Sequence, residues 1–234
     1  MMKYFLASIA GILLCTGHAN AQYKKSVEGP NEFLFKISPL GLFHPDGGPE
    51  ISIEHIITKK QLAFQLEVQP IFMNIWRIDE NDGFAPAGTI ESSYPLGVRL
   101  RPEVRYYLYP KPRRKPWIYV STGFEYKYVN TKRLGTFPVY NGGSEPAYFM
   151  NVTYNDIKQV WGMHMKSGML IPFGESKCLL DISYGMGASY RDFSFKNIPA
   201  GVSEPVRPEN GFGVQQHDGW IFSVPLAVRF CFKL

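Results

Sequence analysis

The most constraining feature of this sequence is a strict alternation of apolar and charged side chains in residues 97–110, GVRLRPEVRYYLYP. Every second residue from position 98 to position 108 is Val, Leu, Pro, Val, Tyr and Leu, whereas the interleaved positions include Arg99, Arg101, Glu103 and Arg105. Successive side chains of a β-strand point to opposite faces, so this period predicts a strand with one apolar and one charged face. The fold then depends on which face points inward.

Seven further segments alternate in the same way. The eight predicted strands are residues 32–43, 50–57, 62–76, 97–110, 116–129, 157–171, 177–193 and 220–232. Short connections at 58–60, 110–116 and 172–176 alternate with long ones at 77–94, 130–156 and 193–217, and the short connection at 44–48 departs from this rule. Antiparallel strands of even number, with short turns at one rim and long loops at the other, are typical of an outer-membrane barrel. We therefore expect an all-β fold, an eight-stranded antiparallel transmembrane β-barrel.

The first 21 residues, MMKYFLASIAGILLCTGHANA, combine Lys3, an apolar run, and small residues at Ala19 and Ala21. This is the plan of a cleaved secretory signal. We predict a signal peptide over residues 1–21 and one barrel domain over residues 22–234, with a lipoprotein signal at Cys15 as an alternative. Beyond residue 22 no apolar run approaches the ~20 residues that a transmembrane helix needs, so we expect strands to cross the membrane.

Composition agrees with a lipid-facing surface. Charged residues make up 19% of the chain and aromatic residues 15%, and low charge with high aromatic content is expected where a protein contacts lipid. The formal net charge of +5 permits an acidic partner. The Lys and Arg residues are spread through the strand segments without a nucleic-acid-binding motif, so we expect no nucleic-acid partner.

The expected barrel assigns the charged face to its interior, because the apolar face must contact lipid. Eight strands leave an interior that side chains just fill, and a buried charge without a partner is very costly. We therefore predict an ion network in the lumen, to which Glu54 could add a further carboxylate. Its members are Arg99, Arg101, Glu103, Arg105, Glu67, Glu125, Lys127, His164, Lys166, Asp181 and Arg229.

The tryptophans suggest how the barrel sits in a bilayer. The predicted strand directions place Trp76, Trp161 and Trp220 at the long-loop ends and Trp117 at a short-turn end. Trp and Tyr are enriched at both membrane–water interfaces. We predict that these four residues belong to two aromatic girdles.

The signal sequence, the eight amphipathic segments and the aromatic C-terminal strand FSVPLAVRFCFKL resemble the small outer-membrane β-barrel families of the OmpA and OmpX type. The resemblance covers the mature chain and implies location in the bacterial outer membrane, contact with outer-membrane lipid, and recognition by the barrel-insertion machinery. Such proteins commonly end in Phe, whereas this chain ends in Leu234 after Phe232. It matches no catalytic signature, so we expect a structural or surface-interaction role with specificity in three long extracellular loops.

Three alternatives remain open from the residues. A secreted, soluble, lipocalin-like binding barrel would turn the apolar face inward. A barrel-embedded lipid-modifying enzyme, such as a lipid A deacylase, could use His164 with Ser167 and Glu125, although Ser167 has the parity of the lipid face. A metal could bind at His44, Asp46, His217 and Asp218, but these residues lack a fixed ligand spacing. We expect no catalytic residue, cofactor or metal.

Prolines and cysteines add two local predictions. Pro39, Pro70, Pro102 and Pro225 fall inside predicted strands, where a missing N–H group predicts bulges or strand ends. Cys178 and Cys231 would lie at the same rim of adjacent strands but on opposite faces of the sheet. Because a disulfide needs Cβ atoms that face each other within ~4 Å, we predict two thiols.

Overall fold

The computed structural model describes residues 32–43, 47–57, 60–72, 91–92, 95–108, 116–140, 147–173, 177–199 and 218–234. The predicted signal peptide, residues 1–21, and Trp76 lie outside the described residues. Nearly all of the described chain is β-strand, in agreement with the all-β prediction. None of the helices among these residues is long and apolar enough to cross a membrane.

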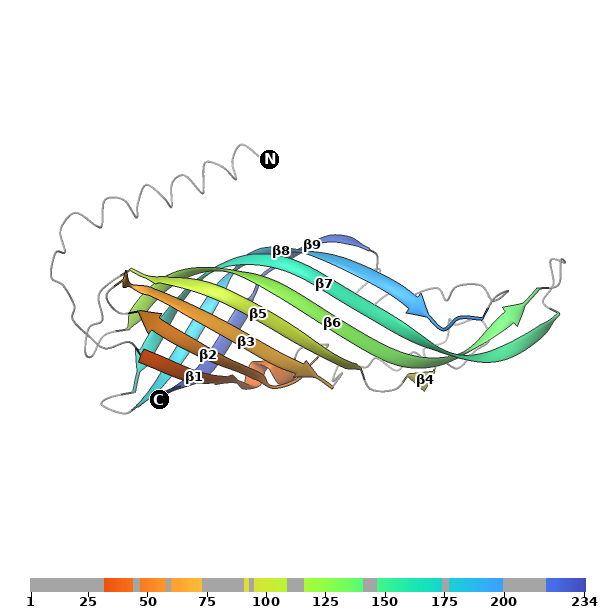
Figure 1. Ribbon diagram of the computed structural model, residues 1–234, viewed down its shortest axis with the longest axis horizontal. Helices are drawn as coiled ribbons and strands as arrows, with labels where there is room; N and C mark the ends of the chain where they lie inside the picture. The colour runs from red at the N-terminus through yellow and green to blue at the C-terminus, as the bar shows by residue number, and fades with distance from the viewer. Residues whose placement is uncertain are drawn as a thin grey trace, which may run out of the picture.

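The strands form one antiparallel sheet that closes on itself (Figure 1). Its elements are β1 (Glu32–Ser38), the 3₁₀ helix η1 (Pro39–Phe43), β2 (Glu50–Ile57), β3 (Leu62–Ile71), β4 (Glu91–Ser92), β5 (Leu96–Tyr107), β6 (Trp117–Val139), β7 (Tyr148–Pro172), β8 (Cys178–Lys196), β9 (Gly219–Ser223) and β10 (Leu226–Lys233). Each strand from β1 to β8 pairs with the next, except that β4 pairs only with β6 and β3 pairs directly with β5. Because β10 pairs with both β8 and β1, the sheet is a ring.

The two last strands share one register on β8. Between the pairs Ser223–Gly187 and Leu226–Tyr184, both strands advance by three residues, so the break at residues 224–225 adds no bulge. Cross-strand partners can also be followed once around the ring from Lys233, through Leu34, Glu54, Gln65, Glu103, Gly123, His164 and Gly187, to Ser223. The path begins at Lys233 and ends at Ser223, so the register is displaced by ten residues once around the ring. We call this displacement the stagger.

The four prolines act in different ways. Pro39 begins η1 and ends β1, and Pro225 lies in the break between β9 and β10. Pro70 stays within β3, where it pairs with Val98. Pro102 stays within β5 but interrupts the β5–β6 pairing, which passes from Leu100–Tyr126 to Glu103–Gly123 without a change of register. The prediction of strand ends holds for two of them, and a missing N–H group causes no bulge at Pro102.

The predicted long loop at 130–156 is wrong for most of its length. Strands β6 and β7 pair without interruption from Trp117–Leu170 to Val139–Tyr148. Pairing of β5 with β6 ends at Asn130, and pairing of β8 with β7 ends at Asn155, so the β6–β7 hairpin projects beyond its neighbours (Figure 1). Residues 194–196, also predicted as loop, belong to β8. The high content of Gly, Pro, Asn and Ser suggested loops, whereas the backbone groups of these residues are hydrogen-bonded between adjacent strands.

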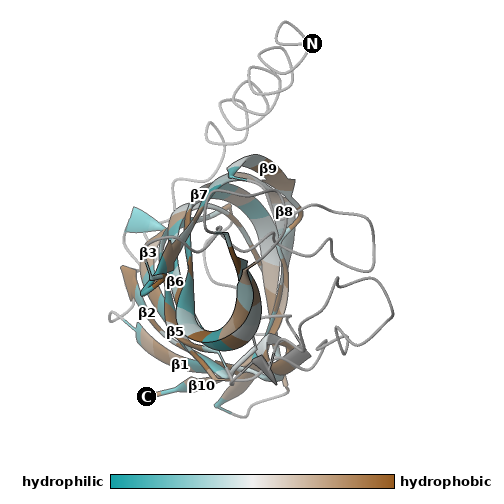
Figure 2. Cartoon of the chain, turned by 90° about the vertical axis from the view of Figure 1, so that its right-hand side faces the viewer, coloured by the Kyte–Doolittle hydropathy of each residue, from teal (hydrophilic) through white to brown (hydrophobic). Residues whose placement is uncertain are grey.

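Apolar and polar side chains alternate along the strands, as the bands of brown and teal in Figure 2 show. The polar set is buried and the apolar set is exposed. On β3, for example, Gln65 and Glu67 are 3% and 1% exposed, whereas Phe64 and Leu66 are 50% and 53% exposed. The ring therefore has a polar inner face and an apolar outer face.

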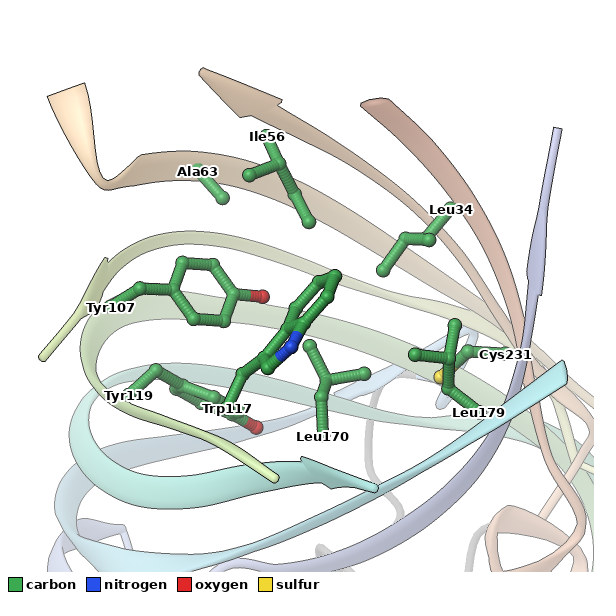
Figure 3. Close-up of a cluster of buried hydrophobic side chains, with 9 residues drawn as sticks. All are labelled: Leu34, Ile56, Ala63, Tyr107, Trp117, Tyr119, Leu170, Leu179 and Cys231. Atoms are coloured by element: carbon green, nitrogen blue, oxygen red, sulfur yellow. The ribbon is translucent and has the colours of Figure 1, made fainter. Parts of the chain in front are cut away.

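One end of the ring is filled by an apolar cluster (Figure 3). Its members are Leu34, Ile56, Ala63, Tyr107, Trp117, Tyr119, Leu170, Leu179 and Cys231. We call this group the apolar plug. Trp117 is only 5% exposed within it and packs edge-on against Tyr107 at a centroid distance of 6.1 Å. The prediction that Trp117 belongs to an outer girdle is therefore wrong, because its position in β6 has the parity of the inner face.

Candidate functional site

The charged residues predicted to share one face are brought together inside the ring. Arg99, Arg101, Glu103, Arg105, Glu67, Lys127, His164, Lys166, Asp181 and Arg229 are all buried, and the Glu125 side chain is 22% exposed. They come from β3, β5, β6, β7, β8 and β10. Their odd or even position along each strand, which we call parity, places them on the inner face. Closure of the ring determines which of them come into contact.

Asp181 is the acceptor at the centre of the group nearest the apolar plug. Its Oδ2 atom accepts from Lys36 Nζ at 2.6 Å and from Arg105 Nη1 at 2.8 Å, while its Oδ1 atom accepts from the Tyr119 hydroxyl at 2.6 Å. Lys36 also pairs with Glu54, whose Oε1 atom accepts from the Tyr107 hydroxyl at 2.6 Å. Tyr107 and Tyr119 thus connect the apolar plug to the neighbouring charged residues.

Glu67 is held by two arginines on opposite walls. Its Oε2 atom accepts from Nε and Nη2 of Arg229 at 3.0 and 2.7 Å, and its Oε1 atom accepts from Nη1 of Arg101. Arg101 also donates from Nε and Nη2 to Glu125 Oε2 at 3.2 and 3.1 Å. Donor and acceptor are both charged in these hydrogen bonds, which makes them stronger than hydrogen bonds between neutral groups.

Glu103 joins strands β5 and β7. It accepts from Arg105 Nε at 2.8 Å, pairs with Lys166, and lies 3.4 Å from His164 Nε2. His164 is therefore next to Glu103 and not to Glu125, the carboxylate considered in the hydrolase alternative. Ser167 pairs with Tyr184 on the other parity and is half-buried. These contacts do not assemble a nucleophile and a base on one face.

Some members of the inner group were not among the predicted network residues. Lys36, Glu50 and Tyr119 all belong to it, and Glu50 pairs with Arg99. Strand parity was a sufficient signal, since Lys36 alternates with Phe35 and Ile37, and Glu50 with Ile51. Lys127 is buried on the same face, 4% exposed.

An aromatic row crosses the outer face of four adjacent strands. Tyr126 pairs with Trp161, Trp161 with Tyr190, and Tyr190 with Trp220. Two of these three pairs are in ring contact, with centroid distances of 4.3 Å between Tyr126 and Trp161 and 5.7 Å between Tyr190 and Trp220. Trp161 and Trp220 are 44% and 75% exposed. At the opposite end, Phe230 and Phe232 are 45% and 41% exposed on the outer face of β10.

The described residues contain no group of three or more His, Cys, Asp or Glu side chains that could hold a metal ion. His44, Asp46 and His217, considered as possible ligands, lie outside the described residues. Cys178 and Cys231 are thiols and not halves of a disulfide, which confirms that prediction. Cys231 is buried, whereas Cys178 is half-buried.

Comparison with known proteins gives a structural likeness at low sequence identity. No family model matches the sequence, and no curated protein matches it. Among solved structures, the chain is similar to a major outer membrane protein from Thermus thermophilus, with 12% sequence identity and a TM-score of 0.44. That alignment covers 88% of this chain and 100% of the other.

Proposed function

We propose that this chain is an integral β-barrel of the bacterial outer membrane, with eight strands and a lumen closed by its own side chains. In this proposal β9 and β10 are two parts of the eighth strand, supported by their common register on β8. Eight strands with a stagger of ten residues correspond to a strand tilt of ~40° from the barrel axis. Residues 1–21 act as the signal peptide that directs the chain out of the cytoplasm.

The observation that carries the proposal is the inverted distribution of polarity. Outward side chains such as Ile53, Leu66 and Met163 are 53%, 53% and 68% exposed, while Arg105 and Asp181 are fully buried. A soluble protein does not expose a continuous apolar belt of this size, because water would drive it to associate. A soluble lipocalin-like barrel would have the opposite arrangement. Lipid is the environment that fits the outer face.

The dimensions of the apolar belt support the same reading. From Trp161 on β7 to Phe173, the residue that follows this strand, the outward positions carry mainly Met, Ile and aromatic residues. At a tilt of ~40° this segment spans ~30 Å along the barrel axis, close to the thickness of a hydrocarbon core. The aromatic row through Trp161 and Trp220 fits one interface, and Phe173, Phe230 and Phe232 fit the other.

The proposed role is structural or surface-interacting and not catalytic. The apolar plug and the ion pairs fill the lower interior, which supports a barrel that does not conduct ions through that end. Outside the membrane, the β6–β7 hairpin carries exposed Tyr140, Tyr148 and Phe149, which are 44%, 52% and 55% exposed. Side chains of this kind are enriched in interfaces, so the hairpin is the proposed contact surface for partners. The aromatic C-terminal strand is the proposed signal for the barrel-insertion machinery.

Electrophoresis of the detergent-extracted protein with and without boiling tests the proposal. A closed barrel resists denaturation in detergent, so the unheated protein should migrate faster than the boiled protein, and cell fractionation should place it in the outer membrane. An Arg105→Leu/Asp181→Leu variant, which lacks the central ion pairs, should lose the fast form at a lower temperature. Full solubility without detergent, with a single mobility, would refute the membrane assignment.

A further inference from the structure

Three hydroxyl side chains lie on the outer face in the middle of the apolar belt. Ser167 on β7 is six residues from Trp161 and six residues from Phe173, the two ends of the belt on this part of the chain. Tyr184 of β8 pairs with Ser167, and Thr122 of β6 is its diagonal neighbour on the other side. Tyr184 is 63% exposed, and Thr122 is also exposed. We call Thr122, Ser167 and Tyr184 the mid-belt hydroxyls.

The mid-belt hydroxyls share one height in the proposed barrel. At a tilt of ~40°, one residue along a strand changes the height by ~2.5 Å, and one step to the paired residue of the next strand changes it by ~3 Å. The three residues therefore lie within ~3 Å of one another along the barrel axis, on three strands that run side by side (Figure 1). The outward residues nearest this height on the other strands are apolar: Ile37, Ile51, Leu66, Val104 and Val228.

The position of these hydroxyls is unfavourable in a bilayer. They point away from the lumen, and within the described residues their side chains make no hydrogen bond. A hydroxyl without a partner in hydrocarbon is costly. The polar groups of lipids lie beyond the two ends of the belt, ~15 Å away, which is further than a Tyr side chain extends. The hydroxyls therefore need a protein partner at their own depth.

Methionine side chains surround the mid-belt hydroxyls. Met163, Met165, Met169 and Met186 lie on the outer faces of β7 and β8 and are 68%, 52%, 39% and 52% exposed. The outward positions of β1, β2 and β3 carry mainly Ile, Leu, Val and Phe instead. Met is unbranched and adapts its shape to a neighbour, so it is common on surfaces that bind other proteins. The outer wall formed by β6, β7 and β8 thus differs from the opposite wall in two ways that both favour a protein contact.

We propose that the outer wall of β6, β7 and β8 is the interface of a dimer within the membrane, and that its partner is a second copy of this chain. This inference rests on the proposed membrane barrel. Each mid-belt hydroxyl exchanges contact with lipid for a hydrogen bond to a hydroxyl of the other copy, and the methionines pack around these bonds. The contact joins side chains of two outer faces, so no strand pairing between the barrels is required.

Symmetry explains why a second copy fits this wall. Two copies inserted in the same direction are related by a two-fold axis along the membrane normal, which leaves every residue at its own height. Hydroxyls that share one height in one copy therefore meet hydroxyls at that height in the other. A hydroxyl both donates and accepts, so like groups can bond each other without a separate complementary surface. In a membrane, such hydrogen bonds and close packing drive association.

Other occupants fit this wall less well. A lipid cannot bring its polar groups to the centre of the belt. A different membrane protein would need its own outward polar group at this depth, whereas a second copy carries three. A different protein is the competing outcome that the first experiment below must separate from a second copy.

Disulfide cross-linking in outer membranes tests the position of the interface. Ser167→Cys is made in a Cys178→Ser background, in which Cys231 remains fully buried. Ile51→Cys in the same background is the matched control, because Ile51 is exposed near the same height on β2, the fourth strand from β7 in either direction. On mild oxidation, we expect at least about tenfold more covalent dimer from Ser167→Cys than from Ile51→Cys. Equal yields, no dimer, or an adduct with a different protein would overturn the proposal.

Energy transfer between labelled copies in phosphatidylcholine vesicles tests the role of the hydroxyls. We expect Ser167→Ala/Tyr184→Phe to raise the dissociation constant of the dimer at least about tenfold. Tyr190→Phe makes the same change on the same strand and face but at the aromatic row, and should leave the dissociation constant unchanged. The double variant should keep the fast electrophoretic form, because it only removes polar groups that face outward. An unchanged dissociation constant in the double variant would overturn the inference.

The same samples separate this inference from the proposed barrel. A wild-type protein that shows the fast unheated form but no energy transfer would leave the barrel standing and remove the dimer. A protein without the fast form would remove both. If Ser167→Cys does not fold, energy transfer in the wild-type chain and in the double variant still decides whether the hydroxyls hold two copies together.

Discussion

The two ends of the ring are built from the same alternating strands but are closed to different degrees. At one end, the apolar plug and the charges around Asp181 fill the interior, and β1 and β10 complete the wall. At the other end, β9 pairs with β8 alone among the described residues, and the β6–β7 hairpin extends past its neighbours. We call these the closed half and the extended half. The difference predicts that the closed half provides most of the stability, and the extended half is where we propose contacts with partners.

The difference in stability between the two halves is tested most strongly by Arg105→Leu in the closed half. Arg105 contacts Asp181, Glu103 and Glu54, all fully or almost fully buried. Its loss removes one of the cations that these carboxylates share, and leaves Lys36 and Lys166 to compensate three buried negative charges. We expect a loss of ~4 kcal/mol in the free energy of unfolding, measured by urea titration in lipid vesicles. Lys196→Leu, at an exposed position of β8, should cost less than ~1 kcal/mol. Equal effects of the two changes would remove the special role of the buried charges.

A slightly smaller effect is expected from Arg101→Leu, which lies nearer the extended half. Its partner Glu67 keeps the two bonds from Arg229, and its other partner, Glu125, is partly exposed. We expect a loss of ~3 kcal/mol in the same titration. If Arg101→Leu costs more than Arg105→Leu, the network is centred on Glu67 and not on Asp181.

A cavity in the apolar plug should destabilise the protein. Leu170 is fully buried, and Leu170→Ala should lower the free energy of unfolding by ~2.5 kcal/mol. Its neighbour Met169 points outward and is 39% exposed, so Met169→Ala should cost less than ~1 kcal/mol. A larger effect at Met169 would place the main apolar packing on the outer surface of the ring.

The smallest effect should come from shortening the projecting hairpin. Replacing residues 135–152 by an Asn-Gly turn joins the paired residues Leu134 and Thr153. Because this segment lies beyond the pairing of β5 and β8, the free energy of unfolding should change by less than ~1 kcal/mol. The temperature at which the fast electrophoretic form disappears should also stay the same. A large loss of stability would show that the extended half supports the ring.

The sequence alone determined the face on which each side chain lies. A two-residue period is a local property of the backbone, so it was enough to place Arg99, Arg101, Arg105 and Asp181 together on the buried face. The same parity would have placed Trp117 inside, where the structure has it. The prediction of a girdle position went wrong because it followed the residue type and its strand end instead of its parity.

Other features were decided only by the tertiary structure. Residues 130–156 were predicted as a loop because the segment is rich in Gly, Pro, Asn and Ser. Residues 130–139 and 148–156 are instead strand, because each segment supplies the other with hydrogen bonds across the hairpin. The partners of the buried charges also depended on closure, since Asp181 on β8 meets Lys36 on β1 and Arg105 on β5 only through the interior of the ring. Parity is set residue by residue, whereas the stagger of ten residues is fixed only when the last strand meets the first, and that stagger determines which charges pair.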